Sequence, residues 1–183
     1  MIEETALNAI IEKLKQSGVS HVAVIPAKDI VIDERVRLKC QIPLCDSYNR
    51  NLTCPPHVPS VDEFRRVLGC FTKAILVQMS EKLTDNRQDT FILANRLHEL
   101  INLGETEAFK VGFRFAMGLI GSSCRLCDEC AGITPGEPCR FPFKARPSMS
   151  AMGIDVIATT EKAGIPVVFP VADTVTWTGV ILL

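Results

Sequence analysis

The chain has 183 residues, 20 Lys plus Arg against 21 Asp plus Glu, and 8 Cys. This length is typical of one domain that buries its own core without disulfide staples, so we expect a single domain over residues 1–183. A net charge of −1 excludes the basic field on which non-specific nucleic-acid binding depends, and we expect no nucleic-acid partner. The cysteine content alone is unusual for an intracellular protein of this size.

The N-terminal residues 1–18 do not resemble a secretion signal. They are acidic from the third residue and amphipathic, with no basic segment ahead of an apolar one. No stretch approaches the ~18 uncharged apolar residues of a membrane-spanning helix. We therefore expect a cytoplasmic protein without a membrane partner. Thiols stay reduced in the cytoplasm, where clustered cysteines bind metal more often than they pair with each other.

Secondary-structure signals in the first half of the chain are mostly clear. Apolar residues at helical spacing predict a helix before Gly18, and the Val- and Ile-rich segment 21–27 predicts a strand. Residues 28–40 are ambiguous and read as strand-like. The four prolines in 41–59 indicate an ordered loop. Ser60 and Glu63 then form a capping box that opens a short helix, and a buried strand is predicted over 73–79.

The second half alternates helices, strands and one long loop. An apolar stripe predicts a helix over 87–103, ended by Gly104, and residues 109–121 form either a strand or a helix followed by a strand. Residues 122–147 contain four Cys and four Pro and read as a second ordered loop. The remaining elements are a helix and two buried strands. These span 148–163, 165–170 and 175–183.

This alternation predicts an α/β or α+β fold, with a small, mostly central sheet flanked by about four helices. Two ordered Cys/Pro loops interrupt it, one in each half. The apolar C-terminal strand belongs either to the core or to a sheet edge that pairs with a second copy, so the chain is a monomer or a homodimer.

The loop 122–147 carries the strongest motif. Cys124, Cys127 and Cys130 follow one another with two residues between them, and Cys139 returns through a Gly/Pro turn. A loop that turns every third side chain inward brings consecutive thiolates to different corners of a [4Fe-4S] cluster. The run is similar to the bacterial ferredoxin pattern C-x2-C-x2-C-x3-C-P. Its last gap is eight residues instead of three, and this longer gap favours closure on the same cluster. Arg140 follows Cys139 where the ferredoxin pattern has proline.

Other chemistry for these four cysteines stays open. Structural zinc takes four thiolates equally well, but zinc sites usually present two separate C-x2-C pairs. Free redox thiols are a further alternative, and the compartment disfavours disulfides. Four nearby cations either stabilise an anionic cluster, form a solvated basic edge or dock an acidic partner. These are Arg125, Arg140, Lys144 and Arg146.

A second set of cysteines lies in the loop 41–59 and just before it. Cys40, Cys45 and Cys54 precede Pro55-Pro56-His57, and a proline after a cysteine fixes the backbone beside a ligand. We interpret these three cysteines as metal or cluster ligands. The fourth ligand is His57, Cys70 or an open iron position, although Cys70 is better explained as a core residue. The two loops could also converge on one site.

Three segments together resemble a known family. They are CPPH at 54–57 with the upstream cysteines, CRLCDEC at 124–130, and PCRFPFKARPSMSAMGIDV at 138–156. The chain resembles the predicted metal-binding proteins of anaerobic bacteria and archaea, a cysteine-rich domain of unknown function of about this length. The resemblance implies an iron–sulfur or other metal site at the seven motif cysteines and implies no particular reaction.

Three functions fit these motifs. The first is a [4Fe-4S] protein of an anaerobe, with one or two clusters, that exchanges electrons with a redox protein partner. The second is an enzyme with an open iron position at the three-cysteine loop. The third is a non-redox module with structural zinc. The sequence contains no nucleotide-binding or serine-hydrolase motif. Only the second of the three functions would make the chain an enzyme, and the motifs do not choose among the three.

Overall fold

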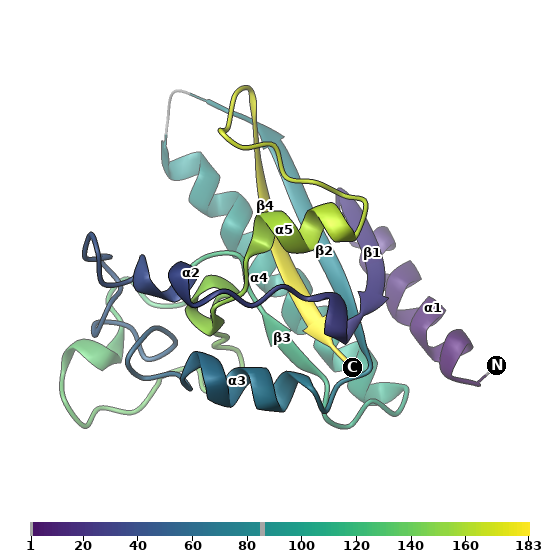
Figure 1. Cartoon of the computed structure of the whole chain (residues 1–183), viewed down its shortest axis with the longest axis horizontal. Coiled ribbons are helices and arrows are strands. Elements are labelled where there is room, and N and C mark those ends of the chain that lie inside the picture. Colours follow the sequence, from purple (N-terminus) through teal and green to yellow (C-terminus); the bar gives the residue numbers. More distant parts are fainter. Residues whose placement is uncertain (1, 85–86) are drawn as a thin grey trace.

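The computed structural model describes residues 2–84 and 87–183 and is built on one four-stranded antiparallel sheet (Figure 1). The strand order is β1-β2-β4-β3. The strands are β1 His21–Pro26, β2 Lys73–Lys82, β3 Met117–Leu119 and β4 Thr174–Leu182. The fold is therefore α+β, and the prediction of a small sheet flanked by helices is confirmed.

Helices cover both faces of this sheet. In Figure 1, α4 runs behind the sheet, and α3 and α5 lie in front of it. The helices are α1 Ile2–Gln16, α2 Glu34–Leu38, α3 Val61–Leu68, α4 Arg87–Lys110 and α5 Val156–Lys162. Three short 3-10 turns complete the described elements: Ala27–Asp29, Ala131–Ile133 and Ser150–Met152. Among the described helices, none is long and apolar enough to cross a bilayer.

The two central strands separate two apolar cores. Along β2, Ile75 and Val77 face the core formed with α1 and α4, while Ala74 and Leu76 face the core that includes α3. Successive side chains of a strand point to opposite faces, so a strand covered on both faces is apolar at every position. This burial explains why β2 and β4 are recognisable as continuous apolar runs in the sequence.

Two helix ends predicted from local sequence signals are confirmed by the structure. Ser60 and Glu63 form the reciprocal capping box at the start of α3. Gly18 adopts a left-handed φ of 88° just after α1 ends. Both signals depend only on residues within one turn of each other, so tertiary contacts did not override them.

Several segments differ from the predicted elements. Residues 28–40 are not a strand, because Asp33 accepts a hydrogen bond from the Arg35 N–H and starts the short helix α2. Residues 148–163 are not one helix, because Gly153 adopts a φ of 80° between a 3-10 turn and α5. Segment 165–170 is an exposed loop, and Phe169 retains 72% of its accessible surface. Residues 109–121 contain both predicted alternatives, the end of α4 and the short strand β3.

Gly104 does not end its helix, which continues to Lys110. A Cβ at this position would clash with Ile181 Cδ1 of β4 and would lie 3.2 Å from Leu14 Cδ2 of α1. Gly104 therefore allows α4 to approach both β4 and α1 closely. A glycine after an apolar stripe can mark either the end of a helix or a point of close packing, and the sequence pattern is the same in both cases.

We predict that Gly104→Val lowers the free energy of unfolding by about 1–3 kcal/mol, because the core around Ile181 must expand to accept the new side chain. Chemical denaturation measures the effect. Thr106→Val is the matched control, because it places the same side chain on the exposed face of the same helix. Equal stability of the two variants would show that Gly104 has no packing role.

Candidate metal centre

The two cysteine-bearing segments lie at the same side of the molecule, next to each other (Figure 1). We call residues 40–57 the N-terminal loop and residues 122–147 the C-terminal loop. The first connects α2 to α3, and the second follows β3 and leads to the 3-10 turn at 150–152. The two loops are therefore neighbours in the fold, although their cysteines line two different cavities.

Asn51 joins the two loops. Its side chain is 7% exposed, and its Nδ2 donates to the carbonyl oxygen of Cys124 at 2.9 Å. Its Oδ1 accepts from both the N–H and the hydroxyl of Thr53, at 3.0 and 2.9 Å. One amide thus shapes the turn before Cys54 and holds the backbone of the first cysteine of the C-x2-C-x2-C run.

Gly132 brings the loops into direct contact at a second point. A Cβ on Gly132 would lie 2.9 Å from Leu52 Cγ, closer than real Cβ atoms approach, and would make a tight contact of 3.1 Å with the Leu52 backbone nitrogen. The turn that carries the chain from Cys130 toward Cys139 can therefore rest on the N-terminal loop only because it has no side chain here.

The four cysteines of the C-terminal loop surround one small cavity of about 20 Å³. The cavity is lined by Cys124, Cys127, Cys130, Cys139, Leu126, Phe141 and Ala145, and residues 51–53 of the N-terminal loop close it. Within the described ranges, no three His, Cys, Asp or Glu side chains converge closely enough to hold a metal ion. The thiols therefore enclose a common space without forming a closed ligand set.

Backbone amides point at two of these sulfurs. The Phe141 N–H donates to Cys139 Sγ at 3.4 Å. The Leu126 backbone donates a hydrogen bond to the Cys124 sulfur, and this bond partly offsets the rise that burial causes in the pKa of that thiol. Hydrogen bonds to ligand sulfurs stabilise thiolates and tune iron–sulfur clusters. The donor set, four soft thiols with two amide donors in a partly apolar cavity, fits a thiolate-bound metal or cluster.

Burial and the neighbouring cysteines raise the pKa of three of these thiols, those of Cys54, Cys124 and Cys40. Burial is the main cause that raises the pKa of Cys54 to about 12, followed by interactions with Cys45 and Cys40 and then with Cys124 and Cys130. Burial likewise raises the pKa of Cys124 and of Cys40. Cys54 thus interacts with cysteines of both loops. A bound cation would offset the charge of several thiolates in this confined region.

The three cysteines of the N-terminal loop line a separate cavity of about 320 Å³. Neither His57 nor Cys70 lines this cavity or the smaller one. The core position expected for Cys70 is wrong. Cys70 follows α3 directly and is exposed there, because Leu68 is the last residue of α3 that turns inward.

The basic residues near the C-terminal loop have specific contacts. Arg125 stacks over the Phe91 ring, with its guanidinium carbon 3.8 Å from the ring centre. Arg140 donates to the carbonyl oxygen of Glu129 at 2.8 Å, within the loop itself. Arg146 forms a half-buried ion pair with Glu105 of α4 at 2.6 Å. Arg140 and Arg146 therefore shape and anchor the loop.

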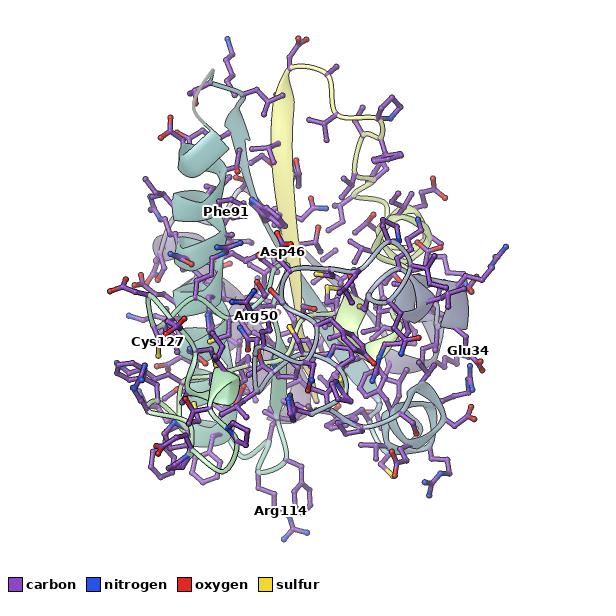
Figure 2. The ribbon with its side chains drawn as sticks, turned by 90° about the vertical axis from the view of Figure 1, so that its left-hand side faces the viewer. Glu34, Asp46, Arg50, Phe91, Arg114 and Cys127 are labelled. Atoms are coloured by element: carbon purple, nitrogen blue, oxygen red, sulfur yellow. The ribbon has the colours of Figure 1, made fainter. Side chains whose placement is uncertain are left out.

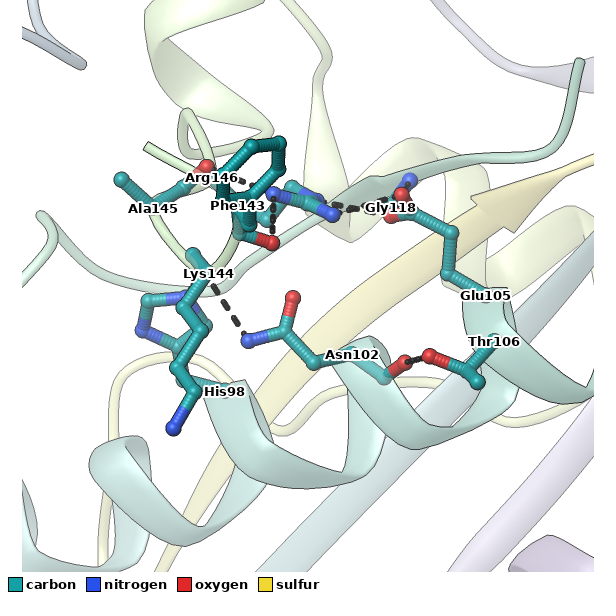
Figure 3. A network of polar contacts seen from close by, with 9 residues as sticks. All are labelled: His98, Asn102, Glu105, Thr106, Gly118, Phe143, Lys144, Ala145 and Arg146. Atoms are coloured by element: carbon teal, nitrogen blue, oxygen red, sulfur yellow. Dashed lines mark hydrogen bonds and ion pairs between the residues drawn. The ribbon is translucent and has the colours of Figure 1, made fainter. Parts of the chain in front are cut away.

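Helix α4 holds the end of the C-terminal loop through the network in Figure 3. The carbonyl oxygen of Lys144 accepts from His98 Nε2 at 2.8 Å and from Asn102 Nδ2 at 3.0 Å. Glu105 accepts from the Gly118 N–H at 2.7 Å in addition to pairing with Arg146. Sequence patterns did not identify Asn51, Gly132 or Glu105, because each acts through residues distant in the chain.

Comparison with known families agrees with this donor set. Residues 23–183 match the family described as predicted metal-binding protein (DUF2284). The chain belongs to this family. The match covers all seven motif cysteines and leaves out residues 1–22, which include α1 and the first residues of β1. No curated protein and no solved structure matches the chain.

We predict that Asn51→Ala lowers the free energy of unfolding by about 1–3 kcal/mol, because it leaves the Cys124 carbonyl without its buried partner. The metal content of the purified variant should fall as well, since the two loops lose their shared contact. Thermal unfolding and elemental analysis measure the two effects. Asn8→Ala, on the exposed side of α1, is the control. A fully stable, metal-replete Asn51→Ala protein would contradict this role.

His98 predicts a pH dependence of stability. Burial lowers its pKa, the Lys144 hydrogen bond opposes this shift, and the nearby charges of Arg146 and Glu99 act in opposite directions. The neutral ring stabilises the fold fully above the unfolded-state pKa of about 6.5, and this contribution is lost as the pH falls through the lower folded-state pKa.

Wild-type protein should therefore lose more stability between pH 7 and pH 5 than His98→Gln, which keeps a donor but does not titrate. Denaturation curves at several pH values measure the difference. His21→Gln, at an exposed position of β1, should behave as the wild type. Parallel pH profiles for wild type and His98→Gln would refute the assignment.

Proposed function

We propose that the chain is an iron–sulfur protein that holds a [4Fe-4S] cluster on Cys124, Cys127, Cys130 and Cys139 and exchanges electrons with a redox protein partner in an anaerobe. One observation carries the proposal. The four cysteines of a C-x2-C-x2-C-x8-C run line one cavity, in a family of predicted metal-binding proteins. A bound cluster would supply one-electron chemistry.

The residues of the chain support iron–sulfur over zinc. Three consecutive cysteines at two-residue spacing reach different corners of a cluster, whereas zinc sites commonly use two separated pairs. The amide donors of Leu126 and Phe141 point at the sulfurs of Cys124 and Cys139. They would stabilise the reduced, more negative state of a cluster.

The position of the C-terminal loop supports transfer to a partner protein. The four cysteines are only partly buried. Four positions after Cys139, Phe143 keeps 91% of its accessible surface, and Arg140 and Lys144 are exposed as well. An exposed aromatic ring among cations is a typical feature of protein-binding surfaces, and it would dock an acidic partner near the cluster.

A second candidate function concerns the N-terminal loop. Cys40, Cys45 and Cys54 share a cavity that neither His57 nor Cys70 lines. Three thiolates without a fourth protein ligand would leave a metal position open to a substrate. The chain would then be an enzyme with a second iron centre in addition to the electron-transfer cluster.

Anaerobic purification followed by iron, acid-labile sulfide and zinc analysis tests the proposal. We expect about four iron and four sulfide per cluster, and an electron paramagnetic resonance signal after reduction. Protein without iron and sulfide, or with stoichiometric zinc that persists after reconstitution with iron and sulfide, would overturn it.

Substitution separates ligand cysteines from the remaining one. Cys127→Ser should lose most of the bound iron and lower the melting temperature, because the order of the loop depends on its metal. Cys70→Ser is the matched control, since Cys70 is exposed and outside both motifs, and it should keep the iron content of the wild type. Full iron content and stability in Cys127→Ser would exclude this residue as a ligand.

A further inference from the structure

A cleft with two parts lies between the cysteine loops and α4. The inner part is the cavity of about 320 Å³ at the N-terminal cysteines, and the outer part has a volume of about 780 Å³. The two parts share Asp46, Ser47, Ser123 and Arg125. Small-molecule sites commonly occupy roughly 300–1,000 Å³, so the cleft has the size of a ligand site.

Arg125 is held in this cleft without a carboxylate partner. Its guanidinium stacks on Phe91, and none of the described Asp or Glu side chains forms an ion pair with it. Stacking fixes the plane of the guanidinium and leaves its in-plane N–H groups free. A guanidinium in this state matches the two oxygens of a carboxylate or a phosphate.

Hydroxyl groups line the inner part. Ser122 and Ser123 come from the segment after β3, and Ser150 comes from the 3-10 turn before α5. In the part of the chain that the structure describes, none of these three hydroxyls has a hydrogen-bond partner, and Ser148 beside them accepts from the Ala151 N–H. Trp177 forms an apolar wall, because its indole N–H already donates to the Thr90 carbonyl.

The charges of the cleft limit what it can bind. Arg50 and Arg125 face Asp46, Asp128 and Glu129, so the outer part has no excess of positive charge. A ligand with several negative groups would be repelled there. A ligand with one oxyanion end and a neutral polar remainder fits Arg125, which stacking on Phe91 holds in place, and the serine hydroxyls.

We propose that this cleft binds a small molecule through one oxyanion group, a carboxylate or a phosphate, with Arg125 as its anchor and the serine hydroxyls as further donors. The bound molecule lies beside Cys40, Cys45 and Cys54. This proposal rests on the proposed function at one point only, namely that the cysteines beside the bound molecule hold a metal. Arg125 and the serines are present with or without the metal.

Isothermal titration calorimetry of the anaerobically purified full chain tests the site. The probes are lactate, inorganic phosphate and the neutral analogue lactamide. We expect lactate or phosphate to bind and lactamide to bind at least about tenfold more weakly, because it lacks the charge that Arg125 recognises. The comparison of lactate with phosphate identifies which oxyanion the cleft prefers.

Two variants locate the anion. Arg125→Gln should weaken binding about tenfold or more, the loss expected for a charged hydrogen-bonded pair. Arg114→Gln is the matched control: Arg114 also stacks on a phenylalanine, Phe115, but lies at the far end of the molecule from Phe91 (Figure 2). Should Arg125→Gln unfold, the double variant Ser123→Ala, Ser150→Ala replaces it, with an expected loss of about threefold.

The proposal is overturned if neither anion binds, if lactamide binds as well as lactate, or if Arg125→Gln and Arg114→Gln bind alike. Metal analysis of the same samples keeps the two ideas separate. Binding that depends on Arg125 in protein without iron supports the cleft and contradicts the cluster. Iron-loaded protein that binds neither anion supports the cluster and contradicts the cleft.

Discussion

The contact between the two cysteine loops, made by the buried amide of Asn51, is the interaction on which the candidate centre depends. Cys54 and Cys124 are 70 positions apart in the numbering, and neither loop has a regular element beyond one 3-10 turn to hold it. Asn51 satisfies the Cys124 carbonyl and shapes its own turn at once, and Gly132 allows the loops to touch. Without this contact, the thiols of the C-terminal loop would lose one wall of their cavity, and the cleft beside Arg125 would open.

The antiparallel sheet and α4 supply the rigid side of this arrangement. Strand β4 and helix α4 belong to one core, and the C-terminal loop is fastened to α4 by the Glu105–Arg146 ion pair and by the two bonds to the Lys144 carbonyl. Functional groups commonly lie on loops that a rigid scaffold positions. Here the scaffold restrains the far end of the C-terminal loop and Asn51 restrains the near end, so the four cysteines between them have few ways to move apart.

Local patterns predicted the parts of the fold that depend on neighbouring residues. The capping box at Ser60 and the strand β2 each depend on a few consecutive residues, and both predictions are confirmed. The cysteine spacing of residues 124–130 is equally local, and it agrees with a family of predicted metal-binding proteins. The errors arose where distant residues decide. Gly104 resembled a helix terminator because its contact with Ile181 is not visible in the sequence, and the apolar run 165–170 lies in an exposed loop. For the same reason the spacing indicated metal chemistry, while the meeting of the two loops became visible only in the fold.

A crystal structure of protein prepared without oxygen, with diffraction recorded on both sides of the iron absorption edge, tests the central claim most directly. We predict an anomalous iron signal in the cavity of the C-terminal loop, with Cys124, Cys127, Cys130 and Cys139 as ligands and Asn51 still bonded to the Cys124 carbonyl. The anomalous scattering of iron rises across this edge, whereas that of zinc does not. The same comparison at the zinc absorption edge locates any zinc. A zinc signal in that cavity, or iron bound elsewhere with these four cysteines free, would contradict the account.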